Sequence, residues 1–300
     1  MSNTIAGAYL AQISQMSLPY LQALLSPVGA FVTDFSDDVS GSGESVTTRY
    51  ASNPVAVDLS SGFSPSNVSM TAKTITLNNY FGFVAAFTDV ERSKSLIDLP
   101  RLFIEPMIQA VGVKFFSTVW NLVTATAFPQ AVDVAAASFD RDNLIDIGAT
   151  LTGTLKAPKT DRAFLCNPTY YAALLKTLNS AEFPGIIMEK TEGMVPRVSG
   201  LDVYQNSEID DNSEALAGFG AHKSALIFAG RRVNADGAAQ AGVEVSDVLV
   251  PGLNLPVQFR RWYSPNDGQL RISAGLLWGA ALGTGMGVRV TTPAYKLSWL

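Results

Sequence analysis

The chain has 300 residues, of which 47% are apolar and 16% are charged; this composition excludes disorder as the main state and suffices for one large domain or two smaller ones. The net charge of −5, without a basic stripe, argues against a dedicated nucleic-acid-binding protein. Such a surface can still lie next to nucleic acid without binding it strongly. The single cysteine, Cys166, excludes an internal disulfide and a cysteine-rich metal site, so we expect the chain to fold in the cytosol.

Residues 1–34 predict an N-terminal arm with one short amphipathic helix, because Leu10, Ile13 and Met16 recur at helical spacing. This region lacks the basic start of a signal peptide. The longest uncharged run, residues 272–288, is interrupted by glycines, so we interpret it as strands and predict no membrane span.

Residues 36–84 are the most informative part of the chain, because they alternate like two β-strands but contain too few apolar residues to fold alone. One face of the outbound strand carries Val46, Thr48 and Tyr50. A turn at residues 60–67 leads into the return strand, where the alternation shifts by one residue near Lys73 and predicts a bulge or a bend. Arms of roughly 14 residues reach about 45 Å, and a lone ribbon is marginal in water. We therefore expect this hairpin to lie on another copy of the protein.

Six side chains of this hairpin are predicted to contact the neighbouring copy: Arg49, Tyr50, Val57, Phe63, Met70 and Lys73. The two basic residues among them have an alternative interpretation, in which they protect a solvated edge strand by their charge.

Residues 99–126 predict a long helix that is apolar on nearly every side and should therefore be covered on most sides. One or two charged helical turns at residues 89–98 precede it. Pro100 suits a first turn, whereas Pro106 should kink the helix or delay its start.

Helices and strands then alternate, which makes the predicted fold class α+β. Ser138 is the predicted N-cap of a helix whose buried face is expected to carry Leu144, Ile147 and Leu151. Residues 162–166 predict a buried strand, followed by a helix with Asn167 as its N-cap and Pro168 at its first position.

The last third of the chain is predicted to be mainly strands. Residues 201–204 predict one strand, and residues 224–229 predict a short helix or a strand. Two alternating runs, 257–263 and 270–276, flank the breaker-rich turn 264–268 and predict a hairpin.

No catalytic, cofactor or metal site is predicted. A Ser-His-Asp triad would have to use His222, the only histidine, for which we favour a structural role. Cys166 lies in an apolar strand, where a thiol usually packs in the core and is unreactive. The glycines between residues 283 and 287 are followed by a strand rather than a helix, so they predict close packing and not a phosphate loop. Two acidic pairs, at residues 37–38 and 210–211, lack metal-loop spacing.

The order of these elements resembles the major capsid proteins of tailed bacteriophages, whose fold is named after phage HK97, and within them the branch similar to the phage P22 coat protein. The segments that carry the resemblance are residues 43–49, 75–78, 102–123, 162–168, 200–204 and 219–225.

The resemblance implies a domain organisation, which we state as an expectation. The predicted parts are an N-terminal arm at 1–35, an extended hairpin called the E-loop at 36–80, a peripheral domain at 81–135 with a spine helix at 89–126, an axial domain at 136–264, and a return to the peripheral strands at 265–300.

The implied function is that of a non-enzymatic major capsid protein, which assembles in the host cytoplasm as hexamers and pentamers of an icosahedral virion head around double-stranded DNA. The implied partners are further copies of the chain, a portal protein and weakly contacted DNA, with or without a decoration protein. Some relatives carry a cleaved N-terminal scaffolding segment; because there is no room for one before residue 36, we expect a separate scaffolding protein. Lys73 could take the place of a cross-linking lysine found in some relatives, but no partner for it can be assigned.

Two alternatives stay open at this point. One is an encapsulin-like shell that holds enzyme cargo, since encapsulins resemble the same fold. The other is an unrecognised hydrolase that uses His222 or acidic residues.

Overall fold

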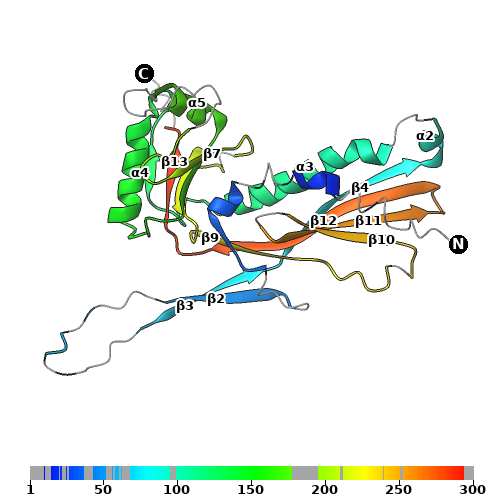
Figure 1. Ribbon diagram of the computed structural model, residues 1–300, viewed down its shortest axis with the longest axis horizontal. Helices are drawn as coiled ribbons and strands as arrows, with labels where there is room; N and C mark the ends of the chain where they lie inside the picture. The colour runs from blue at the N-terminus through cyan, green and yellow to red at the C-terminus, as the bar shows by residue number, and fades with distance from the viewer. Residues whose placement is uncertain are drawn as a thin grey trace, which may run out of the picture.

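The structure is a computed structural model that describes residues 10, 15–19, 21, 25, 27–36, 43–51, 56, 58–60, 62, 68–94, 99–177, 195–209, 212–238, 240–250 and 253–293, with the backbone alone for 99–102 and 104. The described chain forms two lobes, each built on a sheet, and a two-stranded ribbon that projects from them (Figure 1).

The larger sheet is centred on one long strand. Its strands are β4 (Asn79–Thr88), β12 (Gln269–Leu282), β11 (Leu255–Ser264), β10 (Glu244–Val250), β9 (Leu226–Arg231) and β1 (Val32–Asp34), the last preceded by a 3₁₀ turn at Val28–Ala30. β4 pairs with one side of β12, while β11 and then β9 pair with the other side. The predicted final hairpin is confirmed, because Ser264 pairs with Gln269 across the turn.

Helix α3 (Leu99–Trp120) packs along β4 and β12, where the rings of Phe115 and Trp278 have centroids 5.6 Å apart (Figure 1). It follows the short helix α2 (Asp89–Lys94). Pro106 lies inside α3, so it does not delay the start of the helix.

The predicted extension of this helix to residue 126 is wrong, because α3 ends at Trp120 and the chain continues in tight turns. The amide of Asn212 donates to the Val123 carbonyl, at 3.0 Å, and the Glu214 carboxylate accepts from the Ala125 N–H, at 2.7 Å. These distant side chains satisfy backbone groups that further helical bonds would otherwise use.

The second lobe contains a mixed sheet covered by two helices. Its strand order is β5 (Ala131–Asp133), β13 (Gly287–Thr291), β8 (Leu216–His222), β6 (Arg162–Cys166) and β7 (Asp202–Gln205). The helices are α4 (Arg141–Gly153), preceded by a 3₁₀ turn at Ala136–Ser138, and α5 (Pro168–Thr177).

The helix starts test two local predictions. The N-cap of α4 is Asp140 rather than Ser138: its carboxylate accepts from the backbone of Asn143, whose side chain accepts from the Asp140 N–H in return. Ser138 instead ends the preceding 3₁₀ turn. For α5 the predicted N-cap is confirmed, because the Asn167 side chain accepts from the Tyr170 N–H at 3.0 Å.

The two sheets divide the chain differently from the predicted domain ranges. The range 136–264 includes β9, β10 and β11, which pair in the six-stranded sheet, and the range 265–300 includes β13, which pairs with β8. The reason is that the chain crosses between the lobes three times, at residues 121–130, 223–225 and 283–286. The last two crossings are tied by a bond from the Gly283 N–H to the Ala225 carbonyl, at 2.9 Å.

The projecting ribbon consists of β2 (Ser45–Ala51) and β3 (Met70–Thr76), paired antiparallel over seven consecutive positions. The bulge predicted near Lys73 is absent from these pairs, which run without a register shift from Ser45–Thr76 to Ala51–Met70. The apparent shift in the sequence arises because the apolar residues of β3 lie on both of its faces. Ile75 is buried against the six-stranded sheet, whereas Met70 faces solvent on the opposite face of this regular strand.

Candidate assembly surfaces

The predicted contact residues occupy both faces of the ribbon. Cross-strand partners share a face, so Arg49 and Met70 lie on one face and Tyr50 and Lys73 on the other. The first face is exposed, and Met70 is 66% exposed. Val57 and Phe63 lie outside the described residues. The four described residues therefore lie on two opposite faces of the ribbon, and their contact with a neighbouring copy stays a prediction.

The root of the ribbon is anchored on its own chain. Ile75 and Leu77 are buried against Ile227 and Ala229 of β9, and Tyr50 packs on the edge of this cluster. Burial raises the pKa of the Tyr50 hydroxyl above its ordinary value. Tyr50 thus serves at least in part to hold the ribbon to the body.

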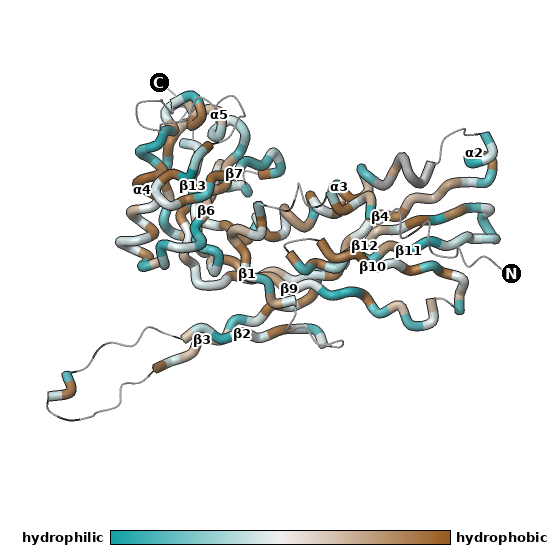
Figure 2. The backbone as a smooth tube through the Cα atoms, in the orientation of Figure 1, coloured by the Kyte–Doolittle hydropathy of each residue, from teal (hydrophilic) through white to brown (hydrophobic). Residues whose placement is uncertain are grey.

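β4 exposes a run of large apolar side chains that our sequence analysis did not identify as a contact surface. The exposed residues are Tyr80, Phe81, Phe83 and Val84. Brown, hydrophobic shades dominate along this strand (Figure 2). The signal was present in the sequence, because residues 79–88 contain neither a charge nor a proline.

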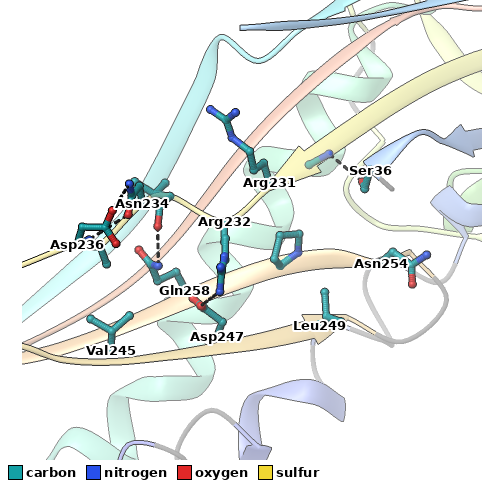
Figure 3. A pocket seen from close by; sticks show the side chains of 14 residues that line it. Ser36, Arg231, Arg232, Asn234, Asp236, Val245, Asp247, Leu249, Asn254 and Gln258 are labelled. Carbon is teal, nitrogen blue, oxygen red and sulfur yellow. Dashed lines mark hydrogen bonds and ion pairs between the residues drawn. The ribbon is translucent and has the colours of Figure 1, made fainter. Parts of the chain in front are cut away.

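A cleft of about 660 Å³ lies beside β9, β10 and β11 (Figure 3). Its charged and polar side chains are engaged with one another: Arg232 lies 3.8 Å from the Asp247 carboxylate, and Gln258 donates to the Val233 carbonyl at 2.9 Å. Its two carboxylates have partners as well, because Asp236 accepts from the Asn234 side-chain amide at 2.7 Å and Asp247 faces Arg232.

His222 takes part in a hydrogen-bonded turn. Its Nδ1 accepts from the Ser224 N–H at 3.2 Å and lies 2.8 Å from the Ser224 Oγ, which in turn bonds the Thr284 hydroxyl at 2.9 Å. Burial lowers the pKa of His222, with Asp161 opposing the effect. These contacts tie the last two crossings between the lobes, which fits the structural role favoured from the sequence.

Cys166 lies in β6 and is fully buried. Burial raises the pKa of its thiol far above the ordinary value, so the reactive thiolate is strongly disfavoured. The predicted buried packing of this side chain is confirmed.

Of the three glycines between residues 283 and 287, Gly283 and Gly287 pack closely, as predicted, whereas Gly285 has no neighbour closer than 4.0 Å to an added Cβ and adopts a positive φ of 74°. A Cβ added to Gly283 would overlap the Ser224 carbonyl, and one added to Gly287 would overlap the Phe219 ring. Within the described ranges, no group of three or more His, Cys, Asp or Glu side chains is placed to hold a metal ion. No helix in that part of the chain is both long and apolar enough to cross a membrane.

No protein-family model and no curated protein matches the sequence. Solved structures share its fold at low identity. A structure from Mycobacterium phage Che8 aligns with a TM-score of 0.62 and 14% identity, over 86% of this chain and 88% of that chain. The capsid structure of the cyanophage P-SCSP1u aligns with a TM-score of 0.63 and 12% identity, over 87% and 86%. The virus-like particle from Pyrococcus furiosus aligns with a TM-score of 0.51 and 13% identity, over 91% and 98%. The chain therefore has the α+β, HK97-type fold of tailed-phage capsid proteins.

Proposed function

We propose that this chain is the major capsid protein of a tailed bacteriophage, which self-assembles into the icosahedral head shell that encloses double-stranded DNA. The observation that carries the proposal is the combination of a capsid-type fold over most of the chain with a ribbon that projects from the body. A two-stranded ribbon is at best marginally stable alone, so its exposed face needs a neighbouring surface. Copies of the chain supply such surfaces in a shell.

The parts of the subunit receive roles within this proposal. The ribbon around β2 and β3 is the E-loop, α3 is the spine helix, and the sheet that contains β12 belongs to the peripheral domain. The lobe that contains β6 and β8 is the axial domain. The shell protein is non-enzymatic and assembles in the host cytoplasm with separate scaffolding and portal proteins, with or without a decoration protein. Its contacts with DNA are weak because its net charge is −5. Membership of the branch similar to the P22 coat protein stays a prediction.

An encapsulin-like compartment is the second candidate, since the virus-like particle from Pyrococcus furiosus aligns with almost all of its own length. Its TM-score of 0.51 is lower than the 0.63 of the cyanophage capsid, which favours the viral proposal.

Electron microscopy of the expressed chain, alone and with the scaffolding protein of the same virus, tests the proposal. We expect closed particles tens of nanometres across. A stable monomer that never assembles under either condition would refute a shell function. Closed particles purified from the native source that contain enzyme cargo in place of DNA would favour the compartment.

A further inference from the structure

Residues 212–215, directly before β8, form a strained segment that we call the clasp. Asn212, Ser213 and Ala215 have positive φ angles of 53°, 57° and 55°. This left-handed conformation is unfavourable for residues that carry a side chain, and three of them within four residues are unusual. Such strain persists only where contacts with the surrounding structure hold it in place.

The contacts that hold the clasp lie just beyond the end of α3. The Asn212 amide donates to the Val123 carbonyl at 3.0 Å, and the Glu214 carboxylate accepts from the Ala125 N–H at 2.7 Å. The guanidinium of Arg289, which is nearly buried in β13, lies 3.2 Å from the same carboxylate. The clasp belongs to the second lobe and α3 to the first, so these bonds connect the two lobes.

Both contacts occupy backbone groups that a longer α3 would use for its own hydrogen bonds. In a continued helix the Ala125 N–H would donate to the Asn121 carbonyl, and the Val123 carbonyl would accept from the N–H four residues further on. The Asn121 N–H still makes its helical bond to the Ser117 carbonyl, at 2.9 Å. The Val123 N–H instead closes a tighter turn on the Trp120 carbonyl, at 2.9 Å. The helix thus ends where side chains of the clasp replace its own hydrogen bonds.

The sequence of residues 121–126 itself favours a helix. It contains neither glycine nor proline, and Leu122 continues the apolar spacing of Phe115 and Val119. The local pattern and the distant contacts therefore oppose each other at this one segment. A segment under such opposing preferences can have two discrete conformations.

We propose that the clasp is a conformational switch that sets the length of α3. In the closed state, which the structure shows, Asn212 and Glu214 hold residues 121–126 in tight turns. In the open state the clasp leaves its left-handed conformation, and α3 extends through residues 121–126. Because the clasp and α3 belong to different lobes, a change in the placement of the lobes shifts the balance between the two states. The inference concerns the folded subunit and does not depend on the proposed shell function.

Amide-resolved hydrogen exchange of the full chain distinguishes the two states at Thr126. Thr126 is exposed, and no acceptor within the described ranges bonds its N–H. In an extended α3 the same N–H would donate to the Leu122 carbonyl and become protected. Opening of the clasp therefore slows exchange at Thr126, whereas local unfolding does not.

The double variant Asn212→Gly, Glu214→Ala removes both side chains that hold the end of α3. We expect its Thr126 amide to exchange at least about tenfold more slowly than that of the unmodified chain, and its helical circular dichroism signal to increase. Asn212→Asp tests the same point while the ion pair of Glu214 and Arg289 stays intact, because an aspartate cannot donate to the Val123 carbonyl. Slower exchange is expected there too, and this variant decides the test where the double variant does not fold. Unchanged or faster exchange at Thr126 in the folded variants would overturn the switch.

Ala215→Gly is the matched control, because glycine adopts the left-handed conformation without steric cost. This variant keeps both holding side chains and relieves part of the strain, so it should favour the closed state. Its Thr126 amide should exchange at least as fast as that of the unmodified chain. Slower exchange in Ala215→Gly would contradict the proposal that strain in the clasp opposes the closed state.

Discussion

Gly279 of β12 lies directly against Thr76 at the end of β3, so closely that a Cβ on Gly279 would overlap the Thr76 carbonyl. The same Cβ would also come within 3.1 Å of the Ile75 side chain. A glycine at this position lets the last residues of the ribbon rest on the six-stranded sheet. The contact buries Ile75 and fixes where the ribbon leaves the body.

Gly279→Ala should lower the free energy of unfolding by about 1–3 kcal/mol, because the added methyl group forces apart two packed backbones. Gly153→Ala is the matched control, since nothing lies within 4 Å of its added Cβ at the end of α4. That change should be neutral or stabilise by up to about 1 kcal/mol. Urea unfolding of both variants measures the difference. Equal stability of the two variants would show that β3 does not depend on close contact at Gly279.

Local signals in the sequence predicted several elements correctly. Asn167 and Pro168 specify the start of α5 through their own side chains, and the turn at residues 264–268 specifies the β11–β12 hairpin. The projecting ribbon was predictable from its alternation and from its small number of apolar residues. In each case the determining residues are neighbours in the sequence.

Features set by distant residues could not be predicted in this way. α3 ends where Asn212 and Glu214 reach the backbone, and these residues are far away in the sequence. β8 and β9 have similar buried patterns but belong to different sheets, because the short turn between them is also a crossing between the lobes. The edge role of β4 depends on its pairing with residues 269–278, so the same apolar pattern could equally have indicated a buried strand.

The ion pair between Glu214 and Arg289 yields a second stability prediction. Arg289 is nearly buried and lies 3.2 Å from the Glu214 carboxylate, which also accepts the Ala125 N–H. Glu214→Ala should destabilise the fold by about 1–3 kcal/mol, because it leaves a buried cation and an N–H without their acceptor. Glu105→Ala, at an exposed position of α3, should change stability by less than about 0.5 kcal/mol. Guanidinium unfolding distinguishes the two, and indistinguishable midpoints would argue against the ion pair as a stabilising contact.

Cys166 should be unreactive in the folded chain. Burial raises the pKa of its thiol, so both access and the thiolate population are minimal at neutral pH. A thiol reagent such as DTNB should label less than about one tenth of the native protein in the time that labels the denatured chain fully. Rapid labelling without denaturant would mean that β6 opens readily.

His222 should contribute a pH dependence to stability. Burial lowers the pKa of His222 in the folded chain below its ordinary value of 6.5, so the unfolded state binds the proton more tightly. The contribution is present above pH 6.5 and is lost as the pH falls through the lowered folded pKa. His222→Asn removes this titration and can keep an acceptor for the Ser224 N–H. Urea unfolding at about pH 7.5 and 5.5, on either side of the ordinary pKa, should show a smaller loss of stability on acidification for the variant. An equal loss in both proteins would exclude His222 as the titrating group.

We propose that the projecting ribbon joins copies of this chain into a closed shell. Replacing residues 48–73 with Asn-Gly closes the ribbon with a two-residue hairpin turn between the paired residues Thr47 and Thr74, and keeps Ile75 and Leu77 in their buried positions. Electron microscopy of this variant beside the unmodified chain, under identical assembly conditions, is the most direct measurement. We expect closed shells from the unmodified chain and soluble, folded subunits or small oligomers from the variant. Normal shells from the shortened chain would contradict the role that we assign to the ribbon.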